Sequence, residues 1–212
     1  WLERFIQIGT SEMYGSVEYA AKEDEPIKPS SPYAASKVAF DMYLDSVHRF
    51  LKFPMNIIRP SNAYCPGQLL HRVIPKAIWC GLTGNKLPLH GGGRAEKSYI
   101  HARDLGRAIH LVAEKAPLGV TYNAGPSAPT SIREVVERTA NAMGIPFDQL
   151  CTVTGERLGQ DSRYWLDSSR IKQDVGWEPQ IGWDEGLAEM VAWGKQYLDE
   201  IRDWPTDYVL RG

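Results

Sequence analysis

Short apolar segments of strand length alternate with amphipathic segments of helical period along the whole sequence. Phe5–Gly9 and Met55–Arg59 are the first two apolar runs, and Pro60 is expected to stop the second. Between them a helix is expected from Pro32 to Phe50, with Ser31 as its N-cap. Its apolar stripe consists of Val38, Met42, Leu44 and Val47. This alternation predicts an α/β fold with a largely parallel sheet.

The segments after the second strand are shorter and predict a smaller lobe laid over the end of the sheet. Expected helices are 71–83, 102–115, 131–143, 168–175 and 184–200, expected strands are 86–90, 97–100 and 120–123, and 151–168 is expected to be irregular.

The Gly-rich fingerprint that normally follows the first strand of a dinucleotide-binding sheet is absent from the sequence. Gly91–Gly93 does not replace it, because no helix is expected after this turn. A strand also stands at the very first residues, where it would have no partner already made. We therefore expect further chain upstream, which would carry the adenosine half of a cofactor site.

Charge and cysteine content exclude several classes of partner. The formal net charge is -2 and the sequence pI about 6.2, so no basic surplus favours nucleic acid or an anionic membrane. No apolar run approaches the ~20 residues of a membrane-spanning helix. The cysteines Cys65, Cys80 and Cys151 lack metal or redox spacing, and the histidines are scattered. We expect reduced thiols, a cytoplasmic protein and no metal site.

Tyr33 and Lys37 form the first chemical constellation, in the segment Tyr-Ala-Ala-Ser-Lys. On a helix the two side chains lie at i and i+4 and share one face. A nearby ammonium favours the tyrosinate form, which can take a proton from a sugar hydroxyl while hydride leaves the same carbon. The alternative is a surface tyrosine beside a solvated lysine. The Pro-rich loop and the Ser-Pro helix start before Tyr33 favour the catalytic interpretation.

Thr10, Ser11 and Glu12 form the second constellation, directly after the first strand. Ligands of open α/β sheets bind beyond the carboxyl ends of the strands, so these side chains are expected at the ligand crevice. A threonine hydroxyl there can hydrogen-bond a sugar oxygen, and a glutamate can remove a proton next to a carbonyl. An ordinary turn with a solvated glutamate is the alternative.

The order of these motifs resembles that of the nucleotide-sugar epimerases and dehydratases, which are extended short-chain dehydrogenases/reductases. Within that family the sequence is most similar to the sugar-nucleotide 4,6-dehydratases. The resemblance covers nearly the whole chain, in the right order. It implies a Rossmann-like, doubly wound parallel sheet, of which the chain carries the C-terminal part, with a smaller α/β substrate-binding lobe. Residues 1–60 would be the remainder of the dinucleotide-binding domain that holds the catalytic residues, and residues 61–212 mainly the lobe, with segments that return to the sheet. The segments that carry it are Thr10–Gly15, Ser31–Lys37, Arg59–Tyr64, Arg72–Pro75, Lys86–Leu89, Tyr99–Asp104, Thr121–Gly125 and Gly176–Pro179.

The resemblance implies a role for each matching position around the cofactor. Thr10, Tyr33 and Lys37 match the catalytic Thr, Tyr and Lys of the family. Tyr33 would be the base for oxidation at C4, and Lys37 would tune it and hold the nicotinamide ribose. Pro60 and Ser61 match the backbone that meets the nicotinamide amide. The implied cofactor is NAD or NADP, with NAD favoured.

Other positions match the family's substrate site, which implies a nucleotide-diphosphate sugar as the bound partner. Asn62 and Arg72 match residues that hold the diphosphate. Lys97 stands where many dehydratases have Arg, so a point charge replaces a bidentate fork. Arg157 and Gln160 match a loop that closes on the diphosphate, although similar dehydratases often carry His at the Gln160 position.

Two further features of the resemblance concern the nucleotide base and the oligomer. Pro88 and His90 match the pocket for the base, with His90 as a stacking ring. The helix from Pro32 to Phe50 is the one through which relatives dimerise, so a homodimer is implied. Phe40 and Tyr43 of that helix would suit such an interface, though they could equally pack inward.

The identity of the reaction depends chiefly on Glu12. A 4-epimerase has no use for a glutamate beside Thr10, whereas in a 4,6-dehydratase it would take the C5 proton after oxidation at C4. Similar dehydratases often have Asp at the Ser11 position, yet GDP-mannose dehydratases and nucleotide-glucuronate decarboxylases also carry Thr-Ser-Glu. The sequence favours dehydration and leaves decarboxylation and epimerisation open. A catalytically inactive scaffold or sensor is the alternative of another class, and the intact Tyr33, Lys37 and Glu12 argue against it.

Overall fold

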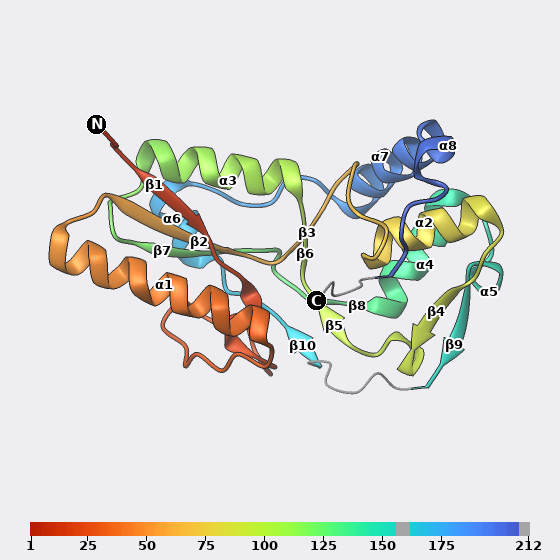
Figure 1. Cartoon of the computed structure of the whole chain (residues 1–212), viewed down its shortest axis with the longest axis horizontal. Coiled ribbons are helices and arrows are strands. Elements are labelled where there is room, and N and C mark those ends of the chain that lie inside the picture. Colours follow the sequence, from red (N-terminus) through yellow and green to blue (C-terminus); the bar gives the residue numbers. More distant parts are fainter. Residues whose placement is uncertain (156–161, 208–212) are drawn as a thin grey trace. The chain divides into compact units, whose positions relative to one another are not determined.

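The computed structural model describes residues 1–155 and 162–207, which form two compact units (Figure 1). Each unit is assembled from three separate stretches of the chain. The first consists of Trp1–Ala63, Glu96–Pro129 and Asp161–Gln180. The second consists of Tyr64–Ala95, Thr130–Gln160 and Ile181–Gly212.

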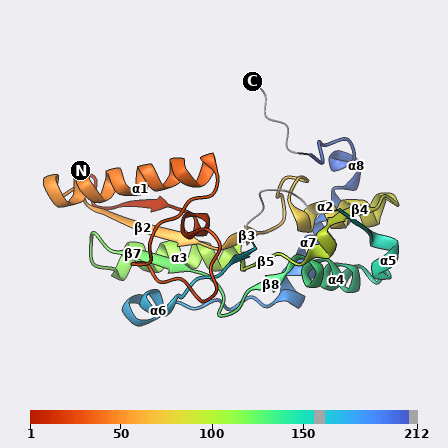
Figure 2. The ribbon, with the colours of Figure 1, turned by 90° about the horizontal axis from the view of Figure 1, so that it is seen from below.

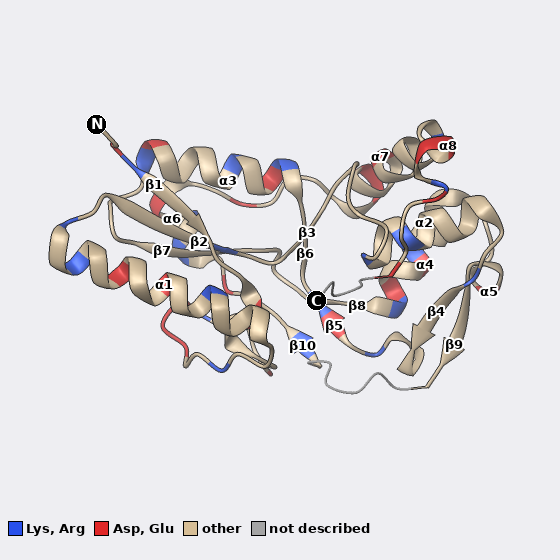
Figure 3. Ribbon diagram, viewed as in Figure 1, with Lys and Arg blue, Asp and Glu red and all other residues tan. Residues whose placement is uncertain are grey.

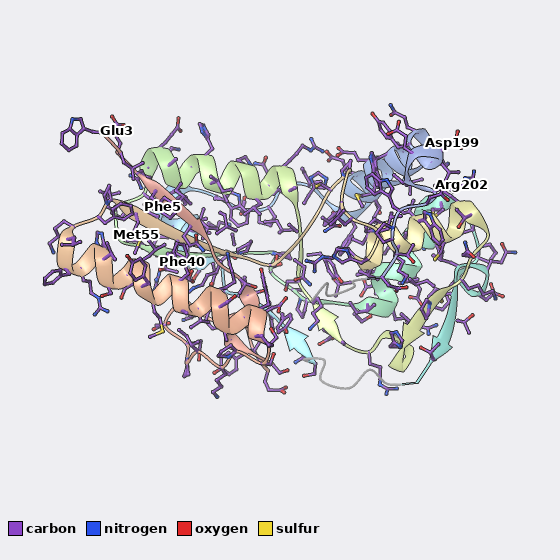
Figure 4. All side chains as sticks on the ribbon, viewed as in Figure 1. Glu3, Phe5, Phe40, Met55, Asp199 and Arg202 are labelled. Atoms are coloured by element: carbon purple, nitrogen blue, oxygen red, sulfur yellow. The ribbon has the colours of Figure 1, made fainter. Side chains whose placement is uncertain are left out.

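A parallel sheet forms the centre of the first unit. Its strands β1 (Phe5–Ile8), β2 (Met55–Pro60) and β7 (Thr121–Ala124) lie in the order β1-β2-β7. Phe5 pairs with Met55 at the start of β1 and β2, and their side chains are labelled in Figure 4. Parallel pairing requires each connection to cross over the sheet, so all three strands end at the same edge.

Helices cover both faces of this sheet, because neighbouring β2 residues bury opposite sides. Ile57 packs with Leu44 of α1 (Pro32–Leu51) on one face. Ile58 lies in a cluster with residues of α3 (Ala102–Lys115) and α6 (Ser169–Val175) on the other. Figure 2 shows α1 on one side of the strands and α3 and α6 on the other. The predicted doubly wound α/β architecture is confirmed.

Strand β2 extends one residue further than predicted. Pro60 does not stop it at Arg59 but is its last residue, paired with Ala124. Proline has no N–H to donate, and the ladder continues here because the Ser61 amide donates to the Ala124 carbonyl at 2.9 Å.

Positive and negative side chains are mixed along helices α1 and α3 of the first unit, where Lys and Arg are interspersed with Asp and Glu (Figure 3).

Short elements account for the rest of the first unit. They are the 3-10 helix η1 (Ser11–Tyr14) and the short strands β3 (Asn62–Tyr64), β5 (Glu96–Lys97), β6 (Tyr99–His101) and β10 (Arg163–Tyr164). Strand β10 pairs with β5 in parallel, Arg163 opposite Glu96 and Tyr164 opposite Lys97. The amide of Asn62 donates to the Ser98 carbonyl at 3.0 Å, which ties the end of β3 to the β6 segment.

The second unit packs helices beside a two-stranded parallel ladder. Strands β4 (Leu87–His90) and β9 (Cys151–Thr154) pair residue by residue. The remaining elements are η2 (Gly91–Gly93), the two-residue strand β8 (Thr130–Ser131), α2 (Val73–Thr83), α4 (Ile132–Met143), α5 (Phe147–Leu150), α7 (Trp183–Gln196) and α8 (Leu198–Ile201). Its core gathers Ala77, Leu89, Val136 and Leu150.

Two predictions for this region were wrong. The stretch 151–168 was expected to be irregular, yet it contains β9 and β10. Thr152 and Val153 are exposed, so β9 lacks the apolar period of a half-buried strand and exists because it pairs with the distant β4. The expected helix 184–200 is broken at Tyr197, whose φ of -107° and ψ of 17° separate α7 from α8. No proline marks this break in the sequence, and the nearest glycine, Gly194, lies inside α7.

Among the residues that the structure describes, no helix has the length and apolar character needed to cross a membrane.

Candidate active site

A tight turn at the carboxyl end of β1 fixes the first group of candidate residues. Thr10 is extended, with φ -154° and ψ 145°, and its Oγ1 accepts a hydrogen bond from the Glu12 amide at 3.2 Å. The amide of Gly15 closes the turn on the Glu12 carbonyl, also at 3.2 Å. Thr10 and Ser11 are buried and Glu12 is half-buried. The turn therefore holds all three predicted side chains on one short, hydrogen-bonded segment.

Gly15 is required where it stands. Its φ of 66° and ψ of -156° lie in a region that only glycine occupies readily, and an added Cβ would approach the Lys28 carbonyl to 2.6 Å. Gly15→Ala should lower the free energy of unfolding by about 2–3 kcal/mol, because backbone strain and the clash add. Urea unfolding measures the effect.

Gly84→Ala is the matched control for this substitution. Gly84 also has a positive φ, 74°, but an added Cβ would meet nothing within 4 Å. Only the conformational cost should remain, roughly 1 kcal/mol. Equal losses in the two variants would contradict the steric role of the Gly15 site.

Helix α1 presents the second group. Ser31 caps it as predicted, its Oγ accepting from the Ala34 amide at 3.1 Å, and Pro32 is the first helical residue. Tyr33 is 55% exposed and Lys37 is half-buried, one turn further on. Val38 packs with Met13 of η1, which brings this end of α1 against the turn that carries Thr10 and Glu12. The two predicted constellations are thus brought together.

The carboxyl end of β2 carries the next candidates. Ser61 is 4% exposed, and within the described part of the chain its Oγ has no hydrogen-bond partner. A Cβ at Gly125 would approach Ser61 Cβ and Oγ to 3.1 Å, so the end of β7 passes close to this hydroxyl. Asn62 is half-buried. Pro60, Ser61 and Asn62 therefore lie at the same sheet edge as Thr10, where a ligand is expected.

Lys97 occupies an unexpected environment for a residue that would hold a diphosphate. It is 6% exposed, and its Nζ lies 3.4 Å from the centroid of the Tyr164 ring. An ammonium this close to an aromatic face is attracted by the ring quadrupole. The structure gives Lys97 a cation–π contact, and its predicted role toward the diphosphate stays a prediction.

The remaining candidates belong to the second unit. Arg72 is exposed at the N-terminus of α2. Pro88 and His90 alternate with the buried Leu87 and Leu89, so both occupy the outward face of β4. His90 Nδ1 lies 3.0 Å from the Thr154 hydroxyl of β9. Two further candidates of the diphosphate loop, Arg157 and Gln160, lie outside the described residues.

A buried polar network behind the site was missed at the sequence level. Arg59 Nε lies 3.3 Å from Asp41 Oδ2, and Arg59 Nη1 donates to the Tyr14 hydroxyl at 2.8 Å. The Tyr14 hydroxyl donates in turn to Asn123 Oδ1 at 3.0 Å. The backbone N–H of Asn123 donates to Glu23 Oε1 at 2.8 Å. Burial raises the pKa of Tyr14, although Arg59 beside it acts in the opposite direction.

A signal for this network was available. Arg59 is the one charged residue of strand β2, and Asp41 lies on the buried face of α1 with Val38 and Leu44. Buried charges are paired, so each implied a partner. Met42 was predicted to lie in the apolar stripe of this helix and is instead 61% exposed. The buried face runs through Asp41, one residue earlier.

The cysteine thiols are weak nucleophiles in this fold. Burial raises the pKa of Cys80 to about 11, and burial also raises the pKa of Cys65 and Cys151. All three are free cysteines. Within residues 1–155 and 162–207, no three His, Cys, Asp or Glu side chains gather as a metal site.

The family model described as GDP-mannose 4,6 dehydratase matches residues 2–190 of the sequence. The chain belongs to the GDP-mannose 4,6 dehydratase family. This confirms the resemblance seen in the motifs. Among relatives of this dehydratase family, the dTDP-glucose 4,6-dehydratase of Streptomyces griseus is 36% identical over 209 residues, covering 98% of the chain and 62% of that protein. The Haemophilus influenzae dTDP-glucose 4,6-dehydratase is 35% identical over 203 residues, covering 90% and 60%.

Solved structures of the dehydratase family and its neighbours have the same fold. DesIV of Streptomyces venezuelae, a dTDP-glucose 4,6-dehydratase solved with NAD bound, superposes with a TM-score of 0.86 at 32% identity, covering 95% of the chain and 62% of DesIV. A UDP-glucose 4-epimerase from Thermotoga maritima, solved with UDP-glucose, gives 0.87 at 26% identity, covering 93% and 65%. The chain spans about three-fifths of the length of the curated relatives that it matches.

Proposed function

We propose that a protein carrying this chain dehydrates a nucleotide-activated sugar at C4–C6 by way of a 4-keto intermediate. The observation that carries the proposal is the packing of two groups in the first unit. Glu12 lies on the turn that Thr10 caps, and the Tyr33–Lys37 end of α1 packs against that turn. A glutamate at this place is what elimination needs beyond oxidation and reduction. The family membership and the dTDP-glucose dehydratase relatives support the same reaction.

We assign NAD as the cofactor, which relatives such as DesIV hold in their solved structures. The described residues fit its nicotinamide half: Ser61 carries a buried hydroxyl without a partner in the described part, and Tyr33 and Lys37 line an accessible helix face. We infer that Ser61 and the Pro60 backbone meet the amide and that Lys37 holds the ribose. When bound, NAD would accept the hydride in the oxidation step and return it in the final reduction.

Tyr33 and Lys37 carry the proton transfer of the oxidation step. The Tyr33 phenolate removes the proton of the C4 hydroxyl as hydride leaves C4. Lys37, one helical turn away, favours the phenolate by its charge. Thr10 accepts or donates a hydrogen bond at the C4 oxygen and keeps that oxygen near Tyr33. The product of this step is a 4-keto sugar.

Glu12 and Ser11 carry the elimination. The C4 carbonyl acidifies the C5 proton, and the Glu12 carboxylate takes that proton. The C6 hydroxyl leaves as water with a proton from the site, and the Ser11 hydroxyl hydrogen-bonds it in this step. Hydride returned to C6 and a proton returned to C5 complete the 4-keto-6-deoxy sugar.

The residues that would hold the rest of the substrate follow from the family match. We infer that Asn62 and Arg72 bind the diphosphate together with Lys97, Arg157 and Gln160. Arg72 is exposed and can offer a bidentate guanidinium to phosphate. Lys97 lies against the Tyr164 ring, so its use here would require the ammonium to leave that ring.

The base pocket rests on a simpler geometric observation. Pro88 and His90 project from the same outward face of β4, two residues apart. We infer that the nucleotide base lies against them, with the His90 ring as a stacking surface held by the Thr154 hydroxyl.

A panel of nucleotide sugars tests the proposed reaction. The whole gene product is incubated with NAD and dTDP-glucose, GDP-mannose, UDP-glucose or UDP-glucuronate, and the product mass is measured. We expect the loss of one water from one of the hexoses. Loss of carbon dioxide would identify a decarboxylase, and unchanged mass with inverted C4 an epimerase. An absence of turnover on every sugar would leave the inactive scaffold as the correct account.

We further propose that the protein is a cytoplasmic homodimer that associates through α1. Phe40 and Tyr43 of this helix are 42% and 62% exposed and stack at a centroid distance of 6.3 Å. Exposed aromatic side chains are enriched at protein interfaces.

Phe40→Glu should convert the dimer to a monomer in light-scattering chromatography. Phe50→Glu, at the far end of α1, is the control, since Phe50 is 85% exposed and no described aromatic ring stacks on it. A Phe40→Glu protein that stays dimeric would contradict this interface.

A further inference from the structure

Asp41 is a buried carboxylate that the proposed reaction does not use. It lies on α1 and is 2% exposed. Its Oδ2 forms an ion pair with Arg59 Nε at 3.3 Å. Its Oδ1 is buried and has no hydrogen-bond partner within residues 1–155 and 162–207. A buried carboxylate oxygen that accepts no hydrogen bond is energetically unfavourable.

The carboxylate lies directly beneath the turn that carries Thr10. A Cβ built on Gly9 would approach Asp41 Oδ2 to 3.0 Å and Oδ1 to 3.4 Å. Gly9 precedes Thr10 and follows the last residue of β1. Both carboxylate oxygens are therefore turned toward the carboxyl end of β1. The glycine is what allows this approach.

Lys37 is a candidate donor for the free oxygen. It precedes Asp41 by four residues on α1, so the two side chains share one face of the helix. The Lys37 charge acts on the carboxyl, because it lowers the pKa of Asp41, as does Arg59. Burial acts more strongly in the other direction and leaves that pKa raised overall. The Lys37 ammonium is thus within electrostatic range of Asp41.

We propose that Asp41 is a positioning residue for the catalytic pair, a carboxylate shared between Arg59 and Lys37 that holds the Lys37 ammonium beside Tyr33 and beneath the β1 turn. Arg59 neutralises one oxygen and anchors α1 to β2. The other oxygen is left to accept from Lys37. The proposal rests on the proposed function only in assigning Tyr33 as the proton acceptor.

Other charged groups near Asp41 do not replace Lys37 in this role. On β2, Arg59 is committed to Asp41, the Tyr14 hydroxyl and the Glu23 carbonyl oxygen. On η1, Tyr14 meets Arg59 and Asn123 rather than the carboxylate. Lys37 is therefore the cation that can complete the carboxylate without breaking the network.

The test compares the NMR signal of Lys37 in three variants of the whole gene product. Lysines are reductively methylated with ¹³C, which keeps their charge, and the Lys37 resonance is assigned by its loss in K37R. In D41N we expect this resonance to move toward the position of a solvent-exposed lysine and to narrow, because the carboxylate that fixes the ammonium is lost. In R59Q the resonance should move in the opposite direction, since the carboxylate then contacts Lys37 alone. D45N, which removes an exposed carboxylate paired with Arg49 on the same helix, should leave it unchanged.

Steady-state kinetics supply the functional readout. We expect kcat of D41N to fall about tenfold, with KM for the sugar unchanged, because Lys37 loses its fixed place rather than the substrate its contacts. An unmoved Lys37 resonance in D41N and R59Q would overturn the proposal, whatever the turnover. No turnover in wild type with the resonance shifted in both variants would instead refute the proposed function alone.

A double variant covers the case in which D41N does not fold. D41N leaves Arg59 buried without its partner, whereas D41L/R59M removes both charges and keeps apolar volume. We expect this double variant to fold and to retain the tenfold loss in kcat. Recovery of wild-type kcat in the folded double variant would show that Asp41 serves only to neutralise Arg59, which would overturn the positioning role.

Discussion

Tyr33→Phe should lower kcat by roughly 10²–10⁴-fold, because the variant loses the group that takes the C4 hydroxyl proton. The fold should be nearly unaffected, since Tyr33 is 55% exposed in the first turn of α1. Binding of the nucleotide sugar should persist, because the contacts inferred for the base and diphosphate lie elsewhere. Steady-state kinetics and a direct binding measurement on the same preparation separate the two effects.

Tyr43→Phe is the matched control for this substitution. Tyr43 belongs to the same helix and is 62% exposed, but it is more than two turns beyond Tyr33. The kcat of the Tyr43→Phe enzyme should remain within a factor of about two of wild type, roughly the effect of an ordinary surface substitution. A Tyr33→Phe enzyme with wild-type kcat would remove Tyr33 from the reaction and with it the proposed role of Lys37.

Glu12→Gln should abolish dehydration while leaving oxidation at C4 in place. The amide cannot take the C5 proton, so we expect a loss of about 10²–10⁴-fold in formation of the deoxy sugar. Glutamine keeps the shape of the side chain, and the turn should survive because the Thr10 hydroxyl bonds the backbone amide of residue 12. Rapid-quench analysis should find the 4-keto hexose accumulating before any water is lost.

Glu18→Gln provides the comparison for loss of a nearby carboxylate. The Glu18 side chain is 90% exposed and lies a few residues beyond the turn. The Glu18→Gln enzyme should dehydrate the sugar at the wild-type rate. A Glu12→Gln enzyme that dehydrates at the wild-type rate would contradict elimination by Glu12. Normal C4 inversion in that variant would favour the epimerase.

The part of the fold that could be predicted is the part that local chemistry determines. Ser31 and Ser131 both cap their helices through side-chain oxygens, at 3.1 Å from the amides of Ala34 and Glu134. The helix Ala102–Lys115 has the bounds that its amphipathic pattern indicated. In each case the deciding interaction joins residues three or four positions apart, so the sequence carries it directly.

The parts that were wrong depend on distant partners. Strand β9 exists because Cys151–Thr154 pair with Leu87–His90, more than sixty residues earlier, and its own side chains carry no strand pattern. The break at Tyr197 has no local breaker. Met42 was assigned to the buried stripe by period alone, although the tertiary contacts of α1 select Asp41 instead.

In the candidate site, too, the features set by neighbouring residues could be predicted and those set by distant partners could not. The i and i+4 spacing of Tyr33 and Lys37, and the turn after β1, were visible in the sequence, and the structure packs the two segments together. The Asp41–Arg59–Tyr14 network joins three segments and required the tertiary structure. Lys97 shows the limit of transferring a role by position, because its place against Tyr164 follows from the pairing of β5 with β10.

One measurement tests the central claim most directly. The whole gene product is incubated in deuterated water with NAD and the nucleotide sugar that it accepts, and the product is analysed by mass and by NMR. The account predicts loss of water, with one solvent deuterium at C5 placed there through the Glu12 site. A product that forms without solvent deuterium at C5, or that keeps all its oxygens, would contradict 4,6-dehydration by this chain's residues.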